Sequence, residues 1–313
     1  MHWQRDWDKL ELYKNMIHKT VLLKEAISGL NIKAGDVFFD ATLGGGGHSE
    51  AVCREFGKTV RVIATDLDEE AISRSTERLV KLQCDFKTFH KSFRQIDEVV
   101  KEAGLDGVDR ELFDLGLSSN QFEDSGRGFS FQKDEPLLMT FKKDLSSDDI
   151  TAREIVNVWD EENIEKILMG YGEESFAKKI ANKIVETRKI KPIETTFDLV
   201  EIIKKATPFW YHKRKIHPAT KTFQALRITV NDEMRSLQDG LEKGFKVLKL
   251  GGRMAVISFH SLEDRMVKNF FKDKVAEGEA ELVNKKPLTP SKEELAENRR
   301  ARSAKLRILQ KIK

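Results

Sequence analysis

The sequence of 313 residues is poor in cysteine, with two, and in proline, with six. Cys53 and Cys84 lie far apart, without a C-x-x-C spacing and without a histidine partner nearby. This arrangement excludes a structural zinc site and gives no sign of a disulfide framework, so we expect both cysteines to be small buried hydrophobic residues. The sequence predicts no metal site.

Long apolar runs are also absent. No stretch approaches the roughly 20 consecutive apolar residues of a membrane span. Residues 1–15 mix charges of both signs with aromatic residues and lack the apolar core of a signal peptide. These absences predict a cytoplasmic protein without a membrane partner. The hydrophobic fraction of 39% is sufficient for a core, and the length for one large domain or two ordinary ones.

The net charge of +3 says little about partners, but its distribution along the chain is uneven. Residues 204–235 hold eight Lys/Arg and two acids, 8 − 2 = +6, and residues 285–313 hold ten and three, 10 − 3 = +7. Such a local excess is typical of surfaces that bind a phosphate backbone. A solvated helix face and a charged tail explain it about equally well.

A run of four glycines, Gly44–Gly47, separates an apolar segment from a helical one. Val37–Asp40 is typical of a buried strand and residues 49–56 of a helix, so the glycines occupy a strand-to-helix turn. Glycines reach positive φ and lack Cβ, which lets a ligand approach the backbone N–H groups. The spacing matches neither G-x-G-x-x-G nor G-x-x-x-x-G-K-[ST], which disfavours a dinucleotide dehydrogenase and a P-loop NTPase. A flexible surface turn is the alternative for the glycines alone.

Strand-like and helix-like segments alternate along residues 37–116, as in a parallel α/β sheet. Three of the strands end in acidic residues, at Asp40, Asp66 and Asp114. The carboxyl ends of parallel strands lie along one crevice, so we expect these carboxylates to line it. Asp66 follows the glycine run by about 20 residues, where an acid can bind ribose hydroxyls.

The alternation stops near residue 118. Residues 118–215 contain helix-like segments and no clear strand, which predicts a helical insertion in the α/β domain. A long helical pattern over 220–250 and a strand over 253–260 then resume the alternation. Residues 304–309 are expected to form a final antiparallel edge strand.

Six motifs follow one another along residues 18–313: DATLGGGGHS (40–49), FDLGLSSNQ (113–121), RGFSF (127–131), HPATKTFQALR (217–227), ISFHSLEDR (257–265) and ARSAKLR (301–307). Together they resemble the RsmH family, also called MraW. The resemblance implies an α/β fold, a seven-stranded Rossmann-like class I methyltransferase core, with an inserted all-α domain. The core would comprise residues 18–118 and 217–313, the helical substrate-recognition domain 119–216, and an N-terminal extension 1–17.

The resemblance also implies the activity. S-adenosylmethionine would be the cofactor, and the acceptor the N4 amino group of a cytidine in the decoding region of 16S-type small-subunit rRNA. The implied partner is this rRNA within an assembled or nearly assembled 30S-type particle. Matching positions imply a cofactor site made of Gly46, Gly47, His48, Asp66, Phe93, Asp114 and Gln121. The residues alone are also consistent with a core aromatic at Phe93 and a helix N-cap at Asp114.

The exocyclic amine of cytosine is a weak nucleophile, so hydrogen-bond acceptors near it would help the transfer. Asp114, Ser258 and His260 are candidates for this role, and His260 can accept when neutral. A histidine at a strand end is more often a hydrogen-bonded structural residue. The fourth strand continues as DLGLSS (114–119), without the two prolines that many amino-methyltransferases carry there, so a backbone acceptor cannot be assumed.

The RGFSF motif combines a cation with two aromatic residues, a composition suited to stacking a base removed from its helix. Packing of the insertion against the core explains the two phenylalanines about equally well. The candidates for substrate binding are Arg127, Phe129, Phe131, His217, Lys221, Arg227 and Arg265.

The sequence departs from the family pattern at four positions. Leu138 and Thr140 replace the usual acid and arginine, and Leu43 and Gly45 replace the commoner phenylalanine and arginine. These departures keep open a second hypothesis, a non-catalytic RNA-binding ribosome-assembly factor that retains the cofactor pocket. A nicotinamide-dependent dehydrogenase is a third hypothesis, which the glycine spacing disfavours.

Overall fold

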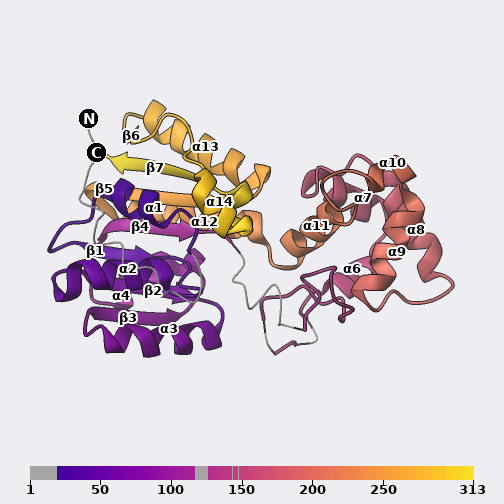
Figure 1. The fold of residues 1–313 in the computed structure, drawn as a ribbon, viewed down its shortest axis with the longest axis horizontal. Helices are drawn as coiled ribbons and strands as arrows, with labels where there is room; N and C mark the ends of the chain where they lie inside the picture. The colour runs from indigo at the N-terminus through magenta and orange to yellow at the C-terminus, as the bar shows by residue number, and fades with distance from the viewer. Residues whose placement is uncertain (1–19, 117–125, 143, 147) are drawn as a thin grey trace. The chain divides into compact units, whose positions relative to one another are not determined.

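The computed structural model describes residues 20–116, 126–142, 144–146 and 148–313 (Figure 1). The chain forms two compact units: unit 1 comprises Met1–Gly116 and Arg235–Lys313, and unit 2 comprises Leu117–Met234. Unit 2 is therefore inserted in the sequence of unit 1. None of the helices in the described ranges is long and apolar enough to cross a membrane.

Unit 1 is built on a seven-stranded sheet in the order β3-β2-β1-β4-β5-β7-β6. The strands are β1 (Val37–Asp40), β2 (Arg61–Asp66), β3 (Asp85–His90), β4 (Val108–Asp114), β5 (Leu248–Ser258), β6 (Ala280–Leu282) and β7 (Lys305–Lys311). Strands β1 to β5 pair in parallel, whereas β7 runs antiparallel to β5 and β6. The predicted seven-stranded α/β sheet is confirmed.

Helices cover both faces of this sheet. They are α1 (Leu23–Leu30), α2 (Gly47–Phe56), α3 (Glu69–Lys81), α4 (Ile96–Glu102), α12 (Glu233–Val247), α13 (Ser261–Ala276) and α14 (Lys292–Glu297), with 3₁₀ turns η2 (Gly57–Thr59), η3 (Phe93–Gln95) and η4 (Arg299–Ser303). Successive residues of a strand point to opposite faces. Phe38 of β1 accordingly packs in a cluster with α1 and α2, and Phe39 in another with α4, α12 and α13. This double core fixes the strand ends that carry the acids.

Two predictions for the C-terminal half are wrong. The expected helix over 220–250 is two helices, α11 (Thr220–Val230) and α12 (Glu233–Val247), because Asp232 adopts a φ of 48° and interrupts the helical backbone. The expected edge strand β7 is an interior strand, because the short β6 pairs with its outer side. A three-residue strand is too short for a sequence pattern to reveal.

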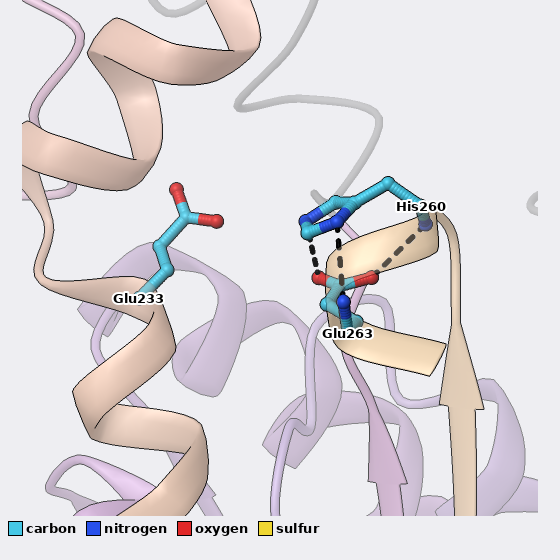
Figure 2. Close-up of side chains that lie close together, drawn as sticks. All are labelled: Glu233, His260 and Glu263. Atoms are coloured by element: carbon cyan, nitrogen blue, oxygen red, sulfur yellow. Dashed lines mark hydrogen bonds and ion pairs between the residues drawn. The ribbon is translucent and has the colours of Figure 1, made fainter. Parts of the chain in front are cut away.

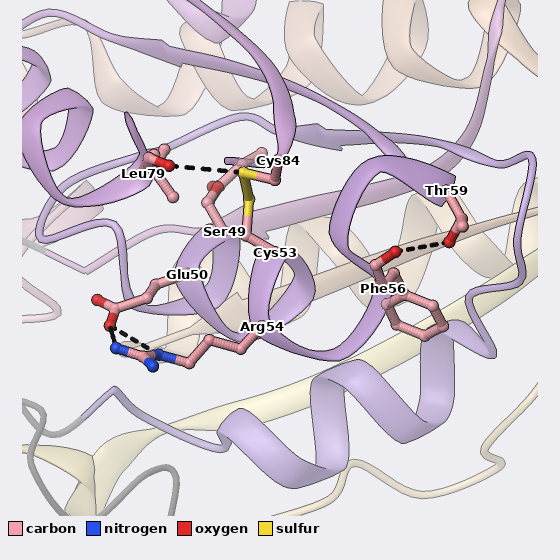
Figure 3. Close-up of a disulfide and its surroundings, with 9 residues drawn as sticks. Ser49, Glu50, Cys53, Arg54, Phe56, Thr59, Leu79 and Cys84 are labelled. Carbon is pink, nitrogen blue, oxygen red and sulfur yellow. Dashed lines mark hydrogen bonds and ion pairs between the residues drawn. A yellow bond between two sulfur atoms is a disulfide. The ribbon is translucent and has the colours of Figure 1, made fainter. Parts of the chain in front are cut away.

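Cys53 and Cys84 form a disulfide (Figure 3), so the prediction of two unlinked buried cysteines is wrong. Cys53 lies on α2 and Cys84 directly precedes β3, and their Cα atoms are 5.5 Å apart across a sequence separation of 31. The linear spacing could not show this proximity, because it arises from the packing of α2 over the sheet.

We expect reduction of this disulfide to lower the free energy of unfolding by about 4 kcal/mol, the loop-entropy value for a cross-link of this span. Urea denaturation with and without reductant measures the effect. The Cys84→Ala variant, which has no bridge to reduce, should show one midpoint under both conditions. A wild-type midpoint that does not respond to reductant would contradict the expectation.

Unit 2 is helical around one apolar cluster. Its helices are α6 (Ala152–Val158), α7 (Glu161–Gly170), α8 (Ala177–Arg188), α9 (Thr196–Ala206), α10 (Phe209–His212) and α11. Ile164, Ile180 and Ile203 are fully buried in this cluster. Phe223 and Leu226 of α11 join it, which explains why the compact unit continues to Met234, whereas the predicted domain ended at residue 216.

Candidate active site

The glycine run forms a tight turn between β1 and α2. Gly44 and Gly46 have φ values of 46° and 71°, in the left-handed region that favours glycine. A Cβ on Gly46 would lie 2.8 Å from Oγ and 2.9 Å from Cβ of Ser75, so the turn packs closely against α3. The N-cap of α2 is Gly46, which has no side chain to cap the helix. The first N–H groups of α2 are therefore suited to an anionic ligand group.

Asp66, at the end of β2, holds this turn in place. Its Oδ2 accepts a hydrogen bond from the N–H of Gly44 at 2.7 Å, and its Oδ1 accepts from the N–H of Asp68 at 2.9 Å. Burial raises the pKa of this carboxyl. Each carboxylate oxygen has a second lone pair, so Asp66 can still accept from a ligand hydroxyl.

Two carboxyls, buried Asp40 and partly buried Asp114, end the neighbouring strands β1 and β4. Asp40 accepts from the hydroxyl of Ser49 at 2.6 Å, and the hydroxyl of Thr42 accepts from the N–H of Asp114 at 2.8 Å. Burial raises the pKa of Asp40 to about 6. Burial and then the charge of Asp40 raise the pKa of Asp114 to about 7. Asp114 therefore exists in both protonation states near neutral pH.

Among the described residues, the one ion-pair contact of Asp114 is with a histidine that is neutral at pH 7. The Oδ1 atom of Asp114 is buried and has no hydrogen-bond partner among the residues that the structure describes. Its Oδ2 lies 3.7 Å from Nδ1 of His48, whose imidazole is neutral at pH 7 because burial lowers its pKa to about 4. Since an unpaired buried carboxylate is unfavourable, this position fits a ligand that brings positive charge.

Phe93 begins η3, just after β3, and is half-buried. Its ring contacts Phe113 of β4 edge to face, with centroids 5.8 Å apart. A Cβ on Gly240 of α12 would lie 2.6 Å from Cδ2 of Phe93, so the missing side chain of Gly240 makes room for the ring. The core thus fixes the orientation of Phe93 without burying it completely.

His260 and Glu263 form a reciprocal cap at the start of α13 (Figure 2). Nδ1 of His260 accepts from the N–H of Glu263 at 3.3 Å, and Nε2 lies 3.1 Å from Oε1 of Glu263. The other carboxylate oxygen accepts from the N–H groups of Phe259 and His260. Buried Ser258 donates to the carbonyl of Lys305 at 3.4 Å. Two of the three catalytic candidates, Ser258 and His260, are therefore engaged in structural hydrogen bonds.

We expect His260→Ala to lower the free energy of unfolding by about 1 kcal/mol through loss of the N-cap. His260→Asn, which preserves an N-cap acceptor, should retain both the stability and most of the methyl transfer. Chemical denaturation and a transfer assay on the same preparations separate the two roles. A His260→Asn protein that is stable but inactive would assign the imidazole to the chemistry instead.

In unit 2, the RGFSF motif lies mainly against the core. Phe129 is buried and stacks on Phe141, with centroids 5.6 Å apart. Arg127 donates to the carbonyl of Phe141 at 2.8 Å and lies over the ring of Phe129. Phe131 is only partly buried and stacks on His217 at 4.4 Å. Of the two phenylalanines, Phe131 is thus the more accessible.

The remaining predicted RNA ligands have different surroundings. Lys221 donates to the carbonyl of Glu173, and Arg227 forms a two-pronged ion pair with Glu233 at 2.9 Å for both bonds. Arg265 is exposed on α13 in unit 1. Gln121, predicted to contact the cofactor, lies outside the described residues.

The sequence analysis did not single out two residues that shape the site. Ser75 packs against Gly46 and donates to the carbonyl of Gly44, and Gly240 admits the ring of Phe93. Ser75 could have been found from the sequence, because it is a polar residue on the buried side of an amphipathic helix. The role of Gly240 could not be predicted, since a glycine within a helical pattern does not reveal what it packs against.

The order of the strands, with an antiparallel β7 beside β5, is that of a class I methyltransferase, and such enzymes use S-adenosylmethionine. Residues 15–312 match the model of the MraW methylase family, and the chain belongs to this family. The predicted membership is thereby confirmed.

Two curated relatives cover nearly the whole chain. Ribosomal RNA small subunit methyltransferase H of Brevibacillus brevis is 42% identical over 311 residues, 94% of this chain and 98% of the relative. The protein of the same name from Dictyoglomus thermophilum is 46% identical over 296 residues, 93% of this chain and 96% of the relative. The solved structure of an rRNA methylase from Streptococcus thermophilus is 12% identical, with a TM-score of 0.42 over 93% of each chain, too distant for an inference.

The residues of the site fit the cofactor S-adenosylmethionine. This molecule carries a positive ammonium and a positive sulfonium besides its carboxylate. The buried Oδ1 of Asp114, which has no hydrogen-bond partner among the described residues, is suited to a cationic group, and the start of α2 after Gly46 to the carboxylate.

Proposed function

We propose that this protein transfers a methyl group from S-adenosylmethionine to the N4 amino group of a cytidine in the decoding region of small-subunit rRNA. The substrate would be an assembled or nearly assembled 30S-type particle in the cytoplasm. The names of the two curated relatives support an rRNA substrate. The observation that carries the chemistry is the Asp114 carboxyl, whose buried Oδ1 has no hydrogen-bond partner among the described residues.

The cofactor supplies, when bound, a methyl group activated for displacement by its positive sulfur. We assign the N–H groups of Gly47 and His48 to its carboxylate and Asp66 to its ribose hydroxyls. Gly46 would contribute the shape of the turn, because its own N–H donates to the carbonyl of Leu43 at 2.6 Å. The half-buried ring of Phe93 would lie against the adenine, where it adds apolar area. Gln121 completes the proposed set.

Asp114 would act on the target amine. The nitrogen lone pair is conjugated with the cytosine ring, so an acceptor bonded to its N–H favours the reactive form. A carboxylate at this position would also be placed to take up the proton released after transfer. Positioning of the amine would provide the larger part of the acceleration.

Mass spectrometry of small-subunit rRNA tests the proposal. In cells that lack the gene, an N4-methylated cytidine of the decoding region should disappear, and the wild-type gene should restore it. An unchanged nucleoside profile would refute the proposal. A complementing Asp114→Asn gene that restores growth or assembly without the methyl group would favour the non-catalytic assembly factor.

Unit 2 is proposed to recognise the RNA substrate. Phe131 stacked on His217 presents an accessible pair of rings, and Lys221 adds positive charge on the following helix. Arg227 on the same helix stays a proposed contact, although its charge is paired with Glu233. Thr140, where the family usually has arginine, is buried, and its Oγ1 accepts from the N–H of Lys142. This inward contact supports a structural role for Thr140.

We expect Gly240→Ala to weaken binding of S-adenosylmethionine, because the new methyl group would displace the ring of Phe93. Overpacking of this kind costs about 1–3 kcal/mol. Calorimetric titration with the cofactor measures the loss. Gly170→Ala, at a helical glycine with no atom within 4 Å of the added Cβ, is the control and should bind normally. Equal affinities of the two variants for S-adenosylmethionine would contradict the proposed contact between Phe93 and the adenine.

A further inference from the structure

We propose that the outer face of α10 stacks unpaired bases of the RNA substrate, an inference that rests on the proposed function. This surface, the α10 patch, consists of Phe209, Trp210, Lys213, Arg214 and Lys215. It lies in unit 2 and is distinct from the Phe131–His217 pair.

One buried tyrosine anchors the α10 patch. Tyr211 is 4% exposed, and its hydroxyl donates to Oε2 of buried Glu174 at 2.7 Å. Its ring packs edge to face on Phe176, with centroids 5.0 Å apart. His212 is held at its Nε2 by the hydroxyl of Thr207 at 2.8 Å. The short helix therefore has a fixed orientation.

This anchoring leaves the two preceding aromatic residues outside. Phe209 is 71% exposed and Trp210 is 55% exposed. Trp210 contacts Phe176 with ring centroids 5.8 Å apart, yet more than half of its surface stays exposed, and clusters of exposed large apolar side chains mark interaction sites. A preorganised ring costs little conformational entropy when a partner stacks on it.

Cations lie over the faces of these rings. Nζ of Lys213 is 4.7 Å from the centroid of Phe209, and Cζ of Arg214 is 4.8 Å from that of Trp210 and 4.9 Å from that of Tyr211. Lys213, Arg214 and Lys215 form no ion pair with any residue that the structure describes. The sequence has no Asp or Glu from Ile202 to Asn231.

This combination fits a single-stranded nucleic acid better than a lipid surface. Aromatic faces stack bases of any sequence, planar guanidinium groups offer a second stacking surface, and unpaired cations hold the phosphates. A membrane-inserting patch would keep its cations at the rim, so that the rings could enter the acyl region. Here each cation lies over one face of a ring, within the patch and not at its rim.

Binding of a single-stranded uridine oligomer about 12 nucleotides long provides the test. We expect Trp210→Ala to weaken binding by about five- to a hundredfold, and Trp210→Phe, which keeps an aromatic face, by much less. Quenching of tryptophan fluorescence by the oligomer should occur in the wild type and decrease in Trp210→Phe. Lys213→Gln should lower the salt slope by about 0.7, whereas Trp210→Ala should leave it unchanged.

Ile190→Ala is the matched control, because Ile190 is 89% exposed elsewhere in unit 2, and it should bind as the wild type does. Equal binding by wild type and Trp210→Ala would overturn the inference, as would stronger binding to phosphatidylglycerol vesicles or to duplex RNA than to the oligomer. Methylation of 30S particles by the wild type is measured separately. If the wild type methylates the particles and Trp210→Ala binds the oligomer normally, only the role of the α10 patch is rejected. If Trp210→Ala loses oligomer binding but the wild type methylates no particles, only the proposed reaction is rejected.

Discussion

Replacing Asp114 by asparagine is expected to slow methyl transfer by about 100- to 10,000-fold, the range for loss of a positioned acid–base group. The amide keeps the size of the side chain but can neither ionise nor balance a cation. Single-turnover transfer from labelled S-adenosylmethionine to undermethylated 30S particles measures the effect. Asp106→Asn, which removes one exposed carboxylate, is the control. Wild-type turnover of the Asp114→Asn protein would remove Asp114 from the mechanism.

The pH dependence of the free energy of unfolding provides a second, independent test of the role of Asp114. The pKa of Asp114 is about 7 in the folded protein, above the ordinary value of 3.8, so folding favours the protonated form. The corresponding stability is fully present below about pH 4 and is lost as the pH rises through about 7. Asp114→Asn lacks this loss, so its stability relative to the wild type should increase between these pH values.

Cofactor affinity should change in the opposite direction. Positive groups of the cofactor interact favourably with the ionised carboxylate, so wild-type affinity should rise as the pH passes from about 6 to about 7.5. The affinity of Asp114→Asn should vary much less. Calorimetric titrations across this range check the sign, and a wild-type affinity that falls with pH would contradict the assignment.

Gly46→Ala should be the most damaging substitution in the glycine turn. It places a Cβ at a φ of 71°, which costs about 1–2 kcal/mol, and 2.8–2.9 Å from the side chain of buried Ser75. Gly46 also immediately precedes α2, whose first N–H groups are assigned to the cofactor carboxylate. We therefore expect cofactor affinity to fall at least about tenfold, together with a lower melting temperature.

Gly44→Ala separates the two causes. Gly44 also has a positive φ, but an added Cβ would have no neighbour closer than 3.8 Å. This variant should bear the backbone cost alone and bind the cofactor better than Gly46→Ala does. Adding Ser75→Gly to Gly46→Ala should recover part of the affinity, because it removes the overlapping atoms. Equal affinities for all three proteins would show that the contact with α3 is unimportant.

The sequence predicted the parts of the fold that have a regular local pattern. The apolar runs that end in Asp40, Asp66 and Asp114 are parallel strands, and the glycines form the turn after the first of them. The disulfide was missed because spacing along the chain does not report proximity across packed layers. The capping role of His260 was left open for a similar reason, since a strand-end histidine has the same sequence signature as a helix N-cap.

Burial within unit 2 was equally hard to predict. Phe129 and Phe131 are two residues apart in one motif, yet the first is in the core and the second is half-exposed. Composition suits both phenylalanines to stacking, and only the packing of Phe141 and His217 distinguishes them. Gly240 shows the same limit, because its importance depends on a ring that lies far away in sequence.

The pairing of β4 with β5 has a consequence for how the chain acquires its structure during synthesis. Asp114 ends β4 and Leu248 begins β5, so 248 − 114 = 134 positions separate two adjacent strands. On the ribosome, unit 2 emerges before β5, β7 or β6 is available. Its early folding would shorten the flexible loop that must close and so reduce the entropic barrier to completing the sheet. Defects in the core of unit 2 should therefore delay maturation of the cofactor site in unit 1.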